Sequence, residues 1–123
     1  MAAIHRAEFR DIDKGLLPGD TWTALRCYQS FLAHPGRYLY LTATVCGCYE
    51  CGLKEDVAIA RDLLELVLTR LHPRPHRELA ALLAILDDQL DRRTLPDPLA
   101  HRRPWSPGEQ WWHHRLYDES SHL

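Results

Sequence analysis

Three cysteines stand close together near the middle of the chain, in the run VCGCYECGL. Cys48 and Cys51 form a C-x-x-C pair followed by a glycine, a turn that lets two thiolates point at one metal ion, and Cys46 adds a third thiolate. Zinc takes thiolate ligands readily and prefers four ligands in tetrahedral geometry. With Cys27 as the fourth ligand the sequence therefore predicts a structural Zn²⁺ site, in which His34 or a C-terminal histidine could replace Cys27.

Two other roles stay open for these cysteines. Standard zinc sites pair one C-x-x-C with a second, and this chain has only one such pair. Reduced thiols at a helix junction are the first competing interpretation, and a redox or iron–sulfur role is the second. A redox C-x-x-C usually opens a helix beside a sheet, and the βαβ pattern of that fold is absent. Cys27 alone is equally compatible with a small buried side chain.

The C-terminal part of the chain concentrates residues that could anchor a partner. Three of the four tryptophans lie between residues 105 and 112. Tryptophan and arginine are the usual energetic anchors of interfaces, so we predict that Trp111, Trp112 and Arg115 bind another protein or a second copy. The alternative is that the tail folds back and its indoles cover the protein's own helices, since each aromatic side chain buries a large area.

Two clusters of charged residues are interpreted as solvent-exposed. The basic cluster comprises Arg70, His72, Arg74, His76 and Arg77. It could hold an anion at the N-terminus of the following helix, but cations near the end of the preceding helix are the simpler interpretation. The acidic cluster comprises Asp87, Asp88 and Asp91, beside Arg92 and Arg93. We expect no enzyme, because the sequence carries no G-x-S-x-G, P-loop, H-E-x-x-H or dinucleotide motif.

The elements that position these residues are mainly helices. A first helix is expected from Trp22 to about Ala33, capped by Asp20 or Thr21. Residues 38–45 alternate like a strand but are also compatible with a buried helix. The only segment that could supply a strand partner is the weakly patterned run 3–12, so the sequence does not decide between the two.

Two amphipathic helices, residues 54–71 and 76–93, are the clearest elements. The short break between them predicts an antiparallel helix hairpin. The break is His72-Pro73-Arg74-Pro75, which would keep His72 and His76 off a common helix. The expected core residues are Leu64, Leu68, Leu82, Leu83 and Leu86.

Composition and charge limit the classes of protein to which the chain could belong. The chain has 123 residues, 46% hydrophobic and 26% charged, which is ordinary for one globular domain. Its net charge of −2 is spread without blocks, so nucleic acid is not the expected partner. No apolar run reaches the ~20 residues of a membrane helix. We expect a soluble, cytoplasmic protein in a reducing compartment, with no membrane partner.

The predicted organisation is a single domain spanning residues 1–123, mainly α, with a small helical bundle built on the hairpin and a Cys-rich junction. Residues 1–19 form an irregular lead and residues 20–93 the helical core. Residues 94–123 combine a proline-rich linker with a short helix that begins near Ser106 and carries the tryptophans.

Three runs carry a resemblance to other proteins. The runs LDRRTLPDP at residues 90–98 and PWSPGEQWWHHRLYD at residues 104–118 are similar to segments of small, uncharacterised, cysteine-containing helical proteins from GC-rich bacterial genomes. The run CYECGLKEDVAIA resembles the cysteine junction in some of them. The resemblance covers roughly the C-terminal three quarters of the chain. It implies a bacterial origin, but no activity and no catalytic residue.

Together these observations favour a non-enzymatic adaptor or regulatory protein with a structural zinc. The alternatives come from two other classes, a DNA-binding regulator and a thiol or iron–sulfur redox protein.

Overall fold

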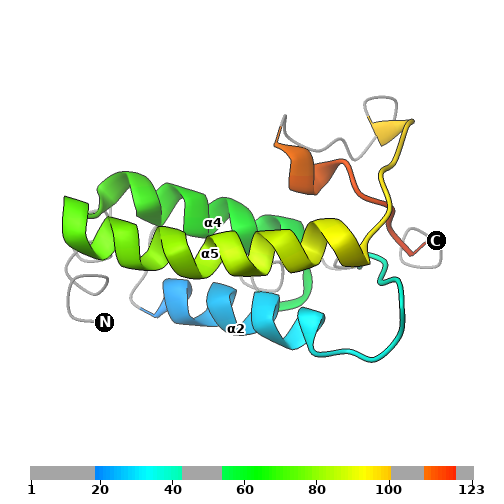
Figure 1. Ribbon diagram of the computed structural model, residues 1–123, viewed down its shortest axis with the longest axis horizontal. Helices are drawn as coiled ribbons and strands as arrows, with labels where there is room; N and C mark the ends of the chain where they lie inside the picture. The colour runs from blue at the N-terminus through cyan, green and yellow to red at the C-terminus, as the bar shows by residue number, and fades with distance from the viewer. Residues whose placement is uncertain (1–18, 43–53, 101–109, 119–123) are drawn as a thin grey trace.

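Helices dominate the computed structural model, which describes residues 19–42, 54–100 and 110–118. In chain order these are α2 (Asp20–Leu32), α4 (Val57–Arg70) and α5 (Pro73–Arg93), followed by the 3₁₀ turn η3 (Trp111–His113). Figure 1 shows the three long helices lying alongside one another and the tail lying over one end of them. The prediction of a mainly α protein is therefore confirmed.

Several expectations fall outside the described residues. They concern the lead before residue 19, the second half of the 38–45 run, and the helix start near Ser106. Cys46, Cys48 and Cys51 also lie outside, and with them the Cys-rich junction.

Helix α2 begins two residues earlier than the sequence pattern indicates. Its N-cap is Gly19 with φ of 88°, a left-handed conformation that glycine adopts without steric cost. The Gly19 carbonyl accepts the first helical bond from the Thr23 N–H at 3.0 Å. The predicted cap at Asp20 or Thr21 is therefore wrong. Asp20 instead lies in the first turn, where a negative charge is favourable to the helix dipole.

Helix α4 has a side-chain cap. Asp56 precedes it in extended conformation, and its carboxylate accepts a hydrogen bond from the Ala58 N–H at 3.0 Å. Such a cap satisfies a backbone donor that has no partner within the helix. Unlike most caps, Asp56 is buried, with only 5% of its surface exposed.

Helix α5 begins at Pro73, so the predicted start at His76 is three residues late. Prolines are tolerated in a first helical turn because their missing N–H groups would have no helical partner there. Both Pro73 and Pro75 occupy this turn. The His72 carbonyl accepts the His76 N–H at 2.9 Å, so His72 is the N-cap of the helix that contains His76. The two prolines lie in the first turn of α5, and His72 lies in extended conformation just outside the helix that contains His76, so the two histidines do not share a helix, as the sequence predicts.

The core forms where the apolar faces of the three helices meet. Only Leu71 and His72 lie between α4 and α5, which run in opposite directions in Figure 1, and α2 packs mainly against α4. The fully buried leucines of this core include Leu63, Leu64, Leu83 and Leu90. Of the five predicted core leucines, Leu64, Leu68, Leu83 and Leu86 are buried, whereas Leu82 is only partly buried at its edge.

Three extended segments meet beside the C-terminal end of α5. Leu41 pairs in parallel with Tyr117, and Pro96 pairs antiparallel with Arg115. The described part of the ambiguous 38–45 run is thus extended, not helical. Among the described residues its partner is the C-terminal tail, because the tail returns to this end of the bundle; the 3–12 run lies outside the described residues.

The described helices were compared with the requirements of a membrane-spanning helix. None of them combines the length and the apolar character that a bilayer crossing requires.

We predict that Leu83→Ala lowers the free energy of unfolding by ~2–5 kcal/mol, because Leu83 is only 1% exposed and its truncation leaves a cavity. Chemical denaturation measures this loss. The matched control is Ile85→Ala on the same helix, where the side chain is 60% exposed and the change should stay within ~0.5 kcal/mol. Equal effects at both positions would contradict the observed burial.

Candidate functional site

An arginine is buried between the helices. Arg61 continues the apolar stripe of α4 yet is only 5% exposed. Its guanidinium makes two parallel bonds to the Asp87 carboxylate on α5, from Nε to Oδ1 and from Nη2 to Oδ2, each 2.9 Å long. Nη1 bonds to Glu65 one turn further along α4, also at 2.9 Å. This two-pronged geometry is the strongest arginine–carboxylate arrangement and fixes α5 against α4.

The same carboxylate reaches the third helix. The Tyr28 hydroxyl of α2 donates to Asp87 Oδ1 at 2.6 Å. Burial, followed by the bond to Asp87, raises the pKa of Tyr28 far above its usual value, so the phenol stays protonated and remains a donor. Asp87 therefore links α2, α4 and α5. The interpretation of Asp87 as part of a solvated acidic face is wrong, although Asp88 and Asp91 are exposed as expected.

The tail also packs onto Arg61. The Trp112 ring lies 4.3 Å from the Arg61 guanidinium carbon, a cation–π contact in a desolvated setting. Its indole Nε1 donates to Asp62 at 2.8 Å, and Trp112 is only 3% exposed. His113 Nε2 lies 2.7 Å from the same Asp62 carboxylate. Trp112 is thus part of the core, as the fold-back alternative requires.

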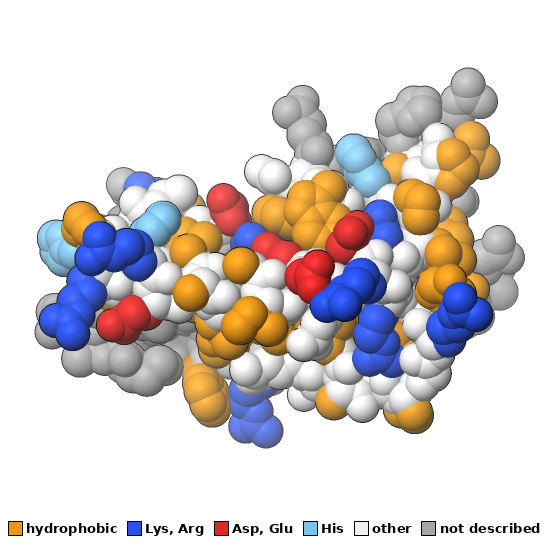
Figure 2. All heavy atoms as spheres, in the orientation of Figure 1, with side chains coloured by type: hydrophobic (Ala, Val, Ile, Leu, Met, Phe, Trp, Pro, Cys, Tyr) orange, Lys and Arg blue, Asp and Glu red, His pale blue; other side chains and the backbone are white. Residues whose placement is uncertain are grey.

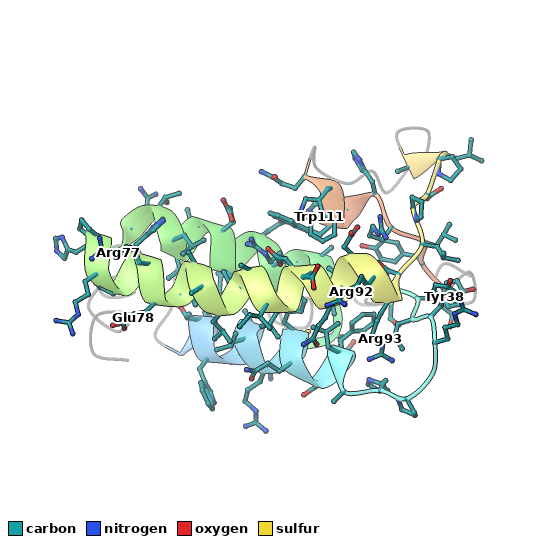
Figure 3. All side chains as sticks on the ribbon, in the orientation of Figure 1. Tyr38, Arg77, Glu78, Arg92, Arg93 and Trp111 are labelled. Carbon is teal, nitrogen blue, oxygen red and sulfur yellow. The ribbon has the colours of Figure 1, made fainter. Side chains whose placement is uncertain are left out.

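The other two predicted partner-binding residues differ from Trp112. Arg115 donates to main-chain carbonyls of Asp91 and Thr94 at 2.9 and 2.7 Å and to the Thr94 hydroxyl at 2.8 Å. These bonds fasten the tail to the end of α5. Trp111 stays 37% exposed, and Figure 3 shows it on the tail above the helices. Of the short helix expected to carry the tryptophans, the described part is one 3₁₀ turn followed by extended chain.

A second buried carboxylate lies where the tail meets the start of α4. Burial raises the pKa of Asp56 to about 6, against the opposing effects of its backbone bonds and of His113. The Tyr117 hydroxyl lies 3.4 Å from Asp56 Oδ1, and burial followed by the Asp56 charge raises the pKa of Tyr117. The Asp56 side chain therefore caps α4 and also lies against Tyr117 of the tail.

Two exposed tyrosines, Tyr38 and Tyr40, lie on the extended segment 38–42, and we call the part of the surface that they form the aromatic end. Tyr38 is 42% exposed and Tyr40 is 48% exposed. Two hollows meet at Tyr40, of about 320 Å³ on the side of Phe31 and Pro35 and about 410 Å³ on the side of Tyr117. Figure 2 shows hydrophobic side chains gathered at this end of the molecule. Large exposed aromatic side chains beside concave surface are typical of interaction sites.

The basic cluster lies at the opposite end of the bundle, where α5 begins (Figure 2). His72, Arg74 and Arg77 are exposed there, and Arg74 is 3.8 Å from Glu78 in an exposed ion pair. His76 Nδ1 instead lies 2.8 Å from the Leu68 carbonyl oxygen. This arrangement is that of a solvated helix start.

Cys27 is the one predicted cysteine ligand of zinc in the described part of the chain. It is buried on α2, and burial followed by the charges of Asp56 and Glu55 raises its thiol pKa to about 11. Lys54 and Cys27 line the same hollow of about 310 Å³. Within the described ranges, no three potential metal ligands converge.

The Arg61–Asp87 pair was not predicted, although the sequence contains a signal for it. Arg61 lies four residues after Val57 and three before Leu64, and both of these apolar residues are buried. A charge inside an apolar stripe indicates a buried ion pair, because an unpaired buried charge is very costly. Nothing comparable pointed to Tyr38 and Tyr40, since their exposure depends on a pairing with a distant tail.

Known proteins give no further guide to this site. No protein-family model matches the chain, and neither a curated protein nor a solved structure matches it.

We predict that Asp87→Asn lowers the free energy of unfolding by ~2–4 kcal/mol, because it removes the two-pronged ionic partner of the buried Arg61 and leaves that charge paired with Glu65 alone. The neighbouring Asp88→Asn is the control. Asp88 pairs with Arg92 in the open, where such pairs contribute ~0–1 kcal/mol. Similar losses for both variants in denaturant titrations would show that the buried Arg61–Asp87 pair contributes no more to stability than an exposed ion pair.

A pH-dependent stability follows from Asp56. Its pKa of about 6 when folded exceeds the 3.8 of the unfolded chain, so folding favours the protonated form. The resulting stability is complete below pH ~4 and is lost as the pH rises through 6, by up to ~3 kcal/mol. Asp56→Asn keeps a good cap and cannot ionise. Relative to the wild type, this variant should therefore gain stability between pH 4 and 7 in denaturant titrations, whereas parallel pH profiles would contradict the assignment.

Proposed function

We propose that this protein is a non-enzymatic adaptor or regulator that binds another protein through its aromatic end. The scaffold is a small helical bundle built on the α4–α5 hairpin. The observation that carries the proposal is the exposure of Tyr38 and Tyr40 beside two adjoining hollows. Tyrosines with this exposure have an apolar ring and a polar tip, a combination enriched at interfaces.

The internal contacts of the other candidate residues add support. Trp112 and Arg115 are engaged with Asp62, Thr94 and the end of α5, so their anchoring capacity is used within the chain. The tail holds residues 38–42 in place through the Leu41–Tyr117 pairing. A rigid scaffold that presents aromatic side chains suits recognition, because little conformational entropy remains to be lost on binding.

A photocrosslinking experiment tests this role. The crosslinker p-benzoylphenylalanine replaces Tyr40 in one variant and Ile85, which is 60% exposed on α5, in the control. After irradiation of cells that produce the protein, mass spectrometry identifies the adducts. We expect a protein adduct from position 40 and none from position 85. Failure to obtain an adduct at position 40, with the folded protein present, would contradict the proposal.

The DNA-binding alternative has weaker support. The net charge is −2, and two of the arginines near the aromatic end are engaged in the fold. Arg93 donates to the carbonyls of Leu32, His34 and Gly36, which fastens the end of α2 to the end of α5. Arginines used in this way have fewer donors left for phosphate groups.

We further propose that Cys46, Cys48, Cys51 and Cys27 hold a structural zinc. Support comes from Lys54, which lines the same hollow as Cys27 and follows Cys51 by only three residues. Three residues span at most ~11 Å, so the chain length allows Cys51 to approach this hollow.

We expect protein purified under reducing conditions to contain about one equivalent of zinc by elemental analysis, and Cys48→Ser to lose both the metal and thermal stability. Cys27→Ser, compared with Ser30→Ala in the same hollow, tests the fourth ligand. A visible absorption band would favour the iron–sulfur alternative. Metal-free protein whose melting temperature is unchanged by chelators would contradict the zinc proposal.

A further inference from the structure

A hollow of about 310 Å³ lies on the outer face of α2, beside the residues that precede α4. Among the described residues that line it, the only charged side chains are Arg26 and Lys54, and both are exposed. Neither forms an ion pair within the described part of the chain. The hollow therefore carries two positive charges that no described carboxylate neutralises.

Arg26 differs in this respect from most arginines of the described chain. The others form ion pairs with carboxylates or hydrogen bonds to main-chain carbonyls, as do Arg61, Arg74, Arg92, Arg93 and Arg115. A guanidinium group has five N–H donors and no acceptor. The donors of Arg26 are therefore free to bind a ligand with negatively charged oxygen atoms.

The same hollow offers hydroxyl groups and an aromatic ring. Thr23 and Ser30 line it, and so does Trp22, which is 49% exposed. Because residues four apart are neighbours on a helix surface, Trp22, Arg26 and Ser30 form one row along α2. Figure 2 shows a hydrophobic and a basic side chain projecting from α2 at the lower edge of the molecule. A ligand in the hollow would thus meet cations, hydroxyl groups and an indole ring together.

We propose that this hollow binds a small phosphorylated ligand, with its phosphate group between Arg26 and Lys54 and a planar ring stacked on Trp22. A phosphate monoester carries a charge of about −1.5 to −2 at neutral pH, which matches the two cations, whereas a single carboxylate would leave one of them unmatched. Its oxygens accept bonds from guanidinium, ammonium and hydroxyl groups. The volume is at the lower end of the range, ~300–1,000 Å³, that holds small ligands.

This inference goes beyond the adaptor role, because none of these residues belongs to the aromatic end. It is also separate from the zinc proposal. Cys27 lines the same hollow but is buried, whereas the row of Trp22, Arg26 and Ser30 is exposed. The ligand would contact the exposed row, and the metal would use the buried thiol.

The first test titrates the full chain with adenosine 5′-monophosphate and follows the indole N–H signals by NMR. We expect the Trp22 signal, identified by its loss in Trp22→Phe, to shift saturably. The Trp112 signal should stay in place, because its indole is buried and bonds to Asp62. Adenosine lacks the phosphate group and inorganic phosphate lacks the ring, so each should bind at least about tenfold more weakly. No saturable shift of the Trp22 signal, or equal binding of the nucleotide and either fragment, would overturn the proposal.

The second test changes the cations. Arg26→Gln and Lys54→Gln should each raise the dissociation constant of adenosine 5′-monophosphate at least about tenfold, because each removes a charged donor to the phosphate group. The matched control is Arg77→Gln. Arg77 is exposed at the start of α5, as Figure 3 shows, and does not line the hollow, so this variant should bind within about twofold of the wild type.

Melting curves that match the wild type verify that these exposed substitutions leave the fold intact. An Arg26→Gln variant that binds the nucleotide as tightly as the wild type would overturn the proposal. A greater loss in Arg77→Gln than in Arg26→Gln would place the phosphate group at the basic cluster instead, and would overturn it as well.

Discussion

The buried charge of Arg61 is the constraint on which the rest of the structure depends. A guanidinium that is 5% exposed must satisfy its donors within the protein, because an unpaired buried charge costs several kcal/mol. Asp87 meets this need from α5, and the same carboxylate accepts from Tyr28 of α2. One ionic contact therefore sets the rotation of α5 about its axis and the position of α2. Apolar contacts alone tolerate several such arrangements.

The tail depends on the same guanidinium group. Trp112 covers the Arg61 guanidinium and removes it from water, which strengthens the bond to Asp87. Once Trp112 and Asp56 hold the tail against α4, Tyr117 is in place to pair with Leu41. The exposure of Tyr40 thus follows from a chain of contacts that begins in the core. This dependence connects the polar interior to the surface proposed for binding.

The sequence was sufficient for elements whose determinants are local. The helices α2, α4 and α5 follow from apolar periodicity, and the errors at their ends come from particular caps: a left-handed Gly19 and two prolines that begin α5. The tail could be predicted only as one of two alternatives, because its partners Asp62 and Thr94 are distant along the chain. For the same reason the sequence left the 38–45 run undecided. The prediction that the whole acidic cluster is solvated was wrong because Asp87 and Asp88 are adjacent in sequence but differ in exposure. Asp87 is partly buried and bonded to Arg61, whereas Asp88 is exposed.

The central claim is that Arg61 couples the helix interface to the tail, and a double-mutant cycle between Asp87→Asn and Trp112→Leu measures that coupling most directly. The two side chains contact Arg61 in different ways, Asp87 through hydrogen bonds and Trp112 through its ring, and do not bond to each other. If Arg61 connects them, their effects on the free energy of unfolding should be non-additive by ~0.5–3 kcal/mol. Additivity within ~0.3 kcal/mol would show that the two contacts act separately and would contradict the account.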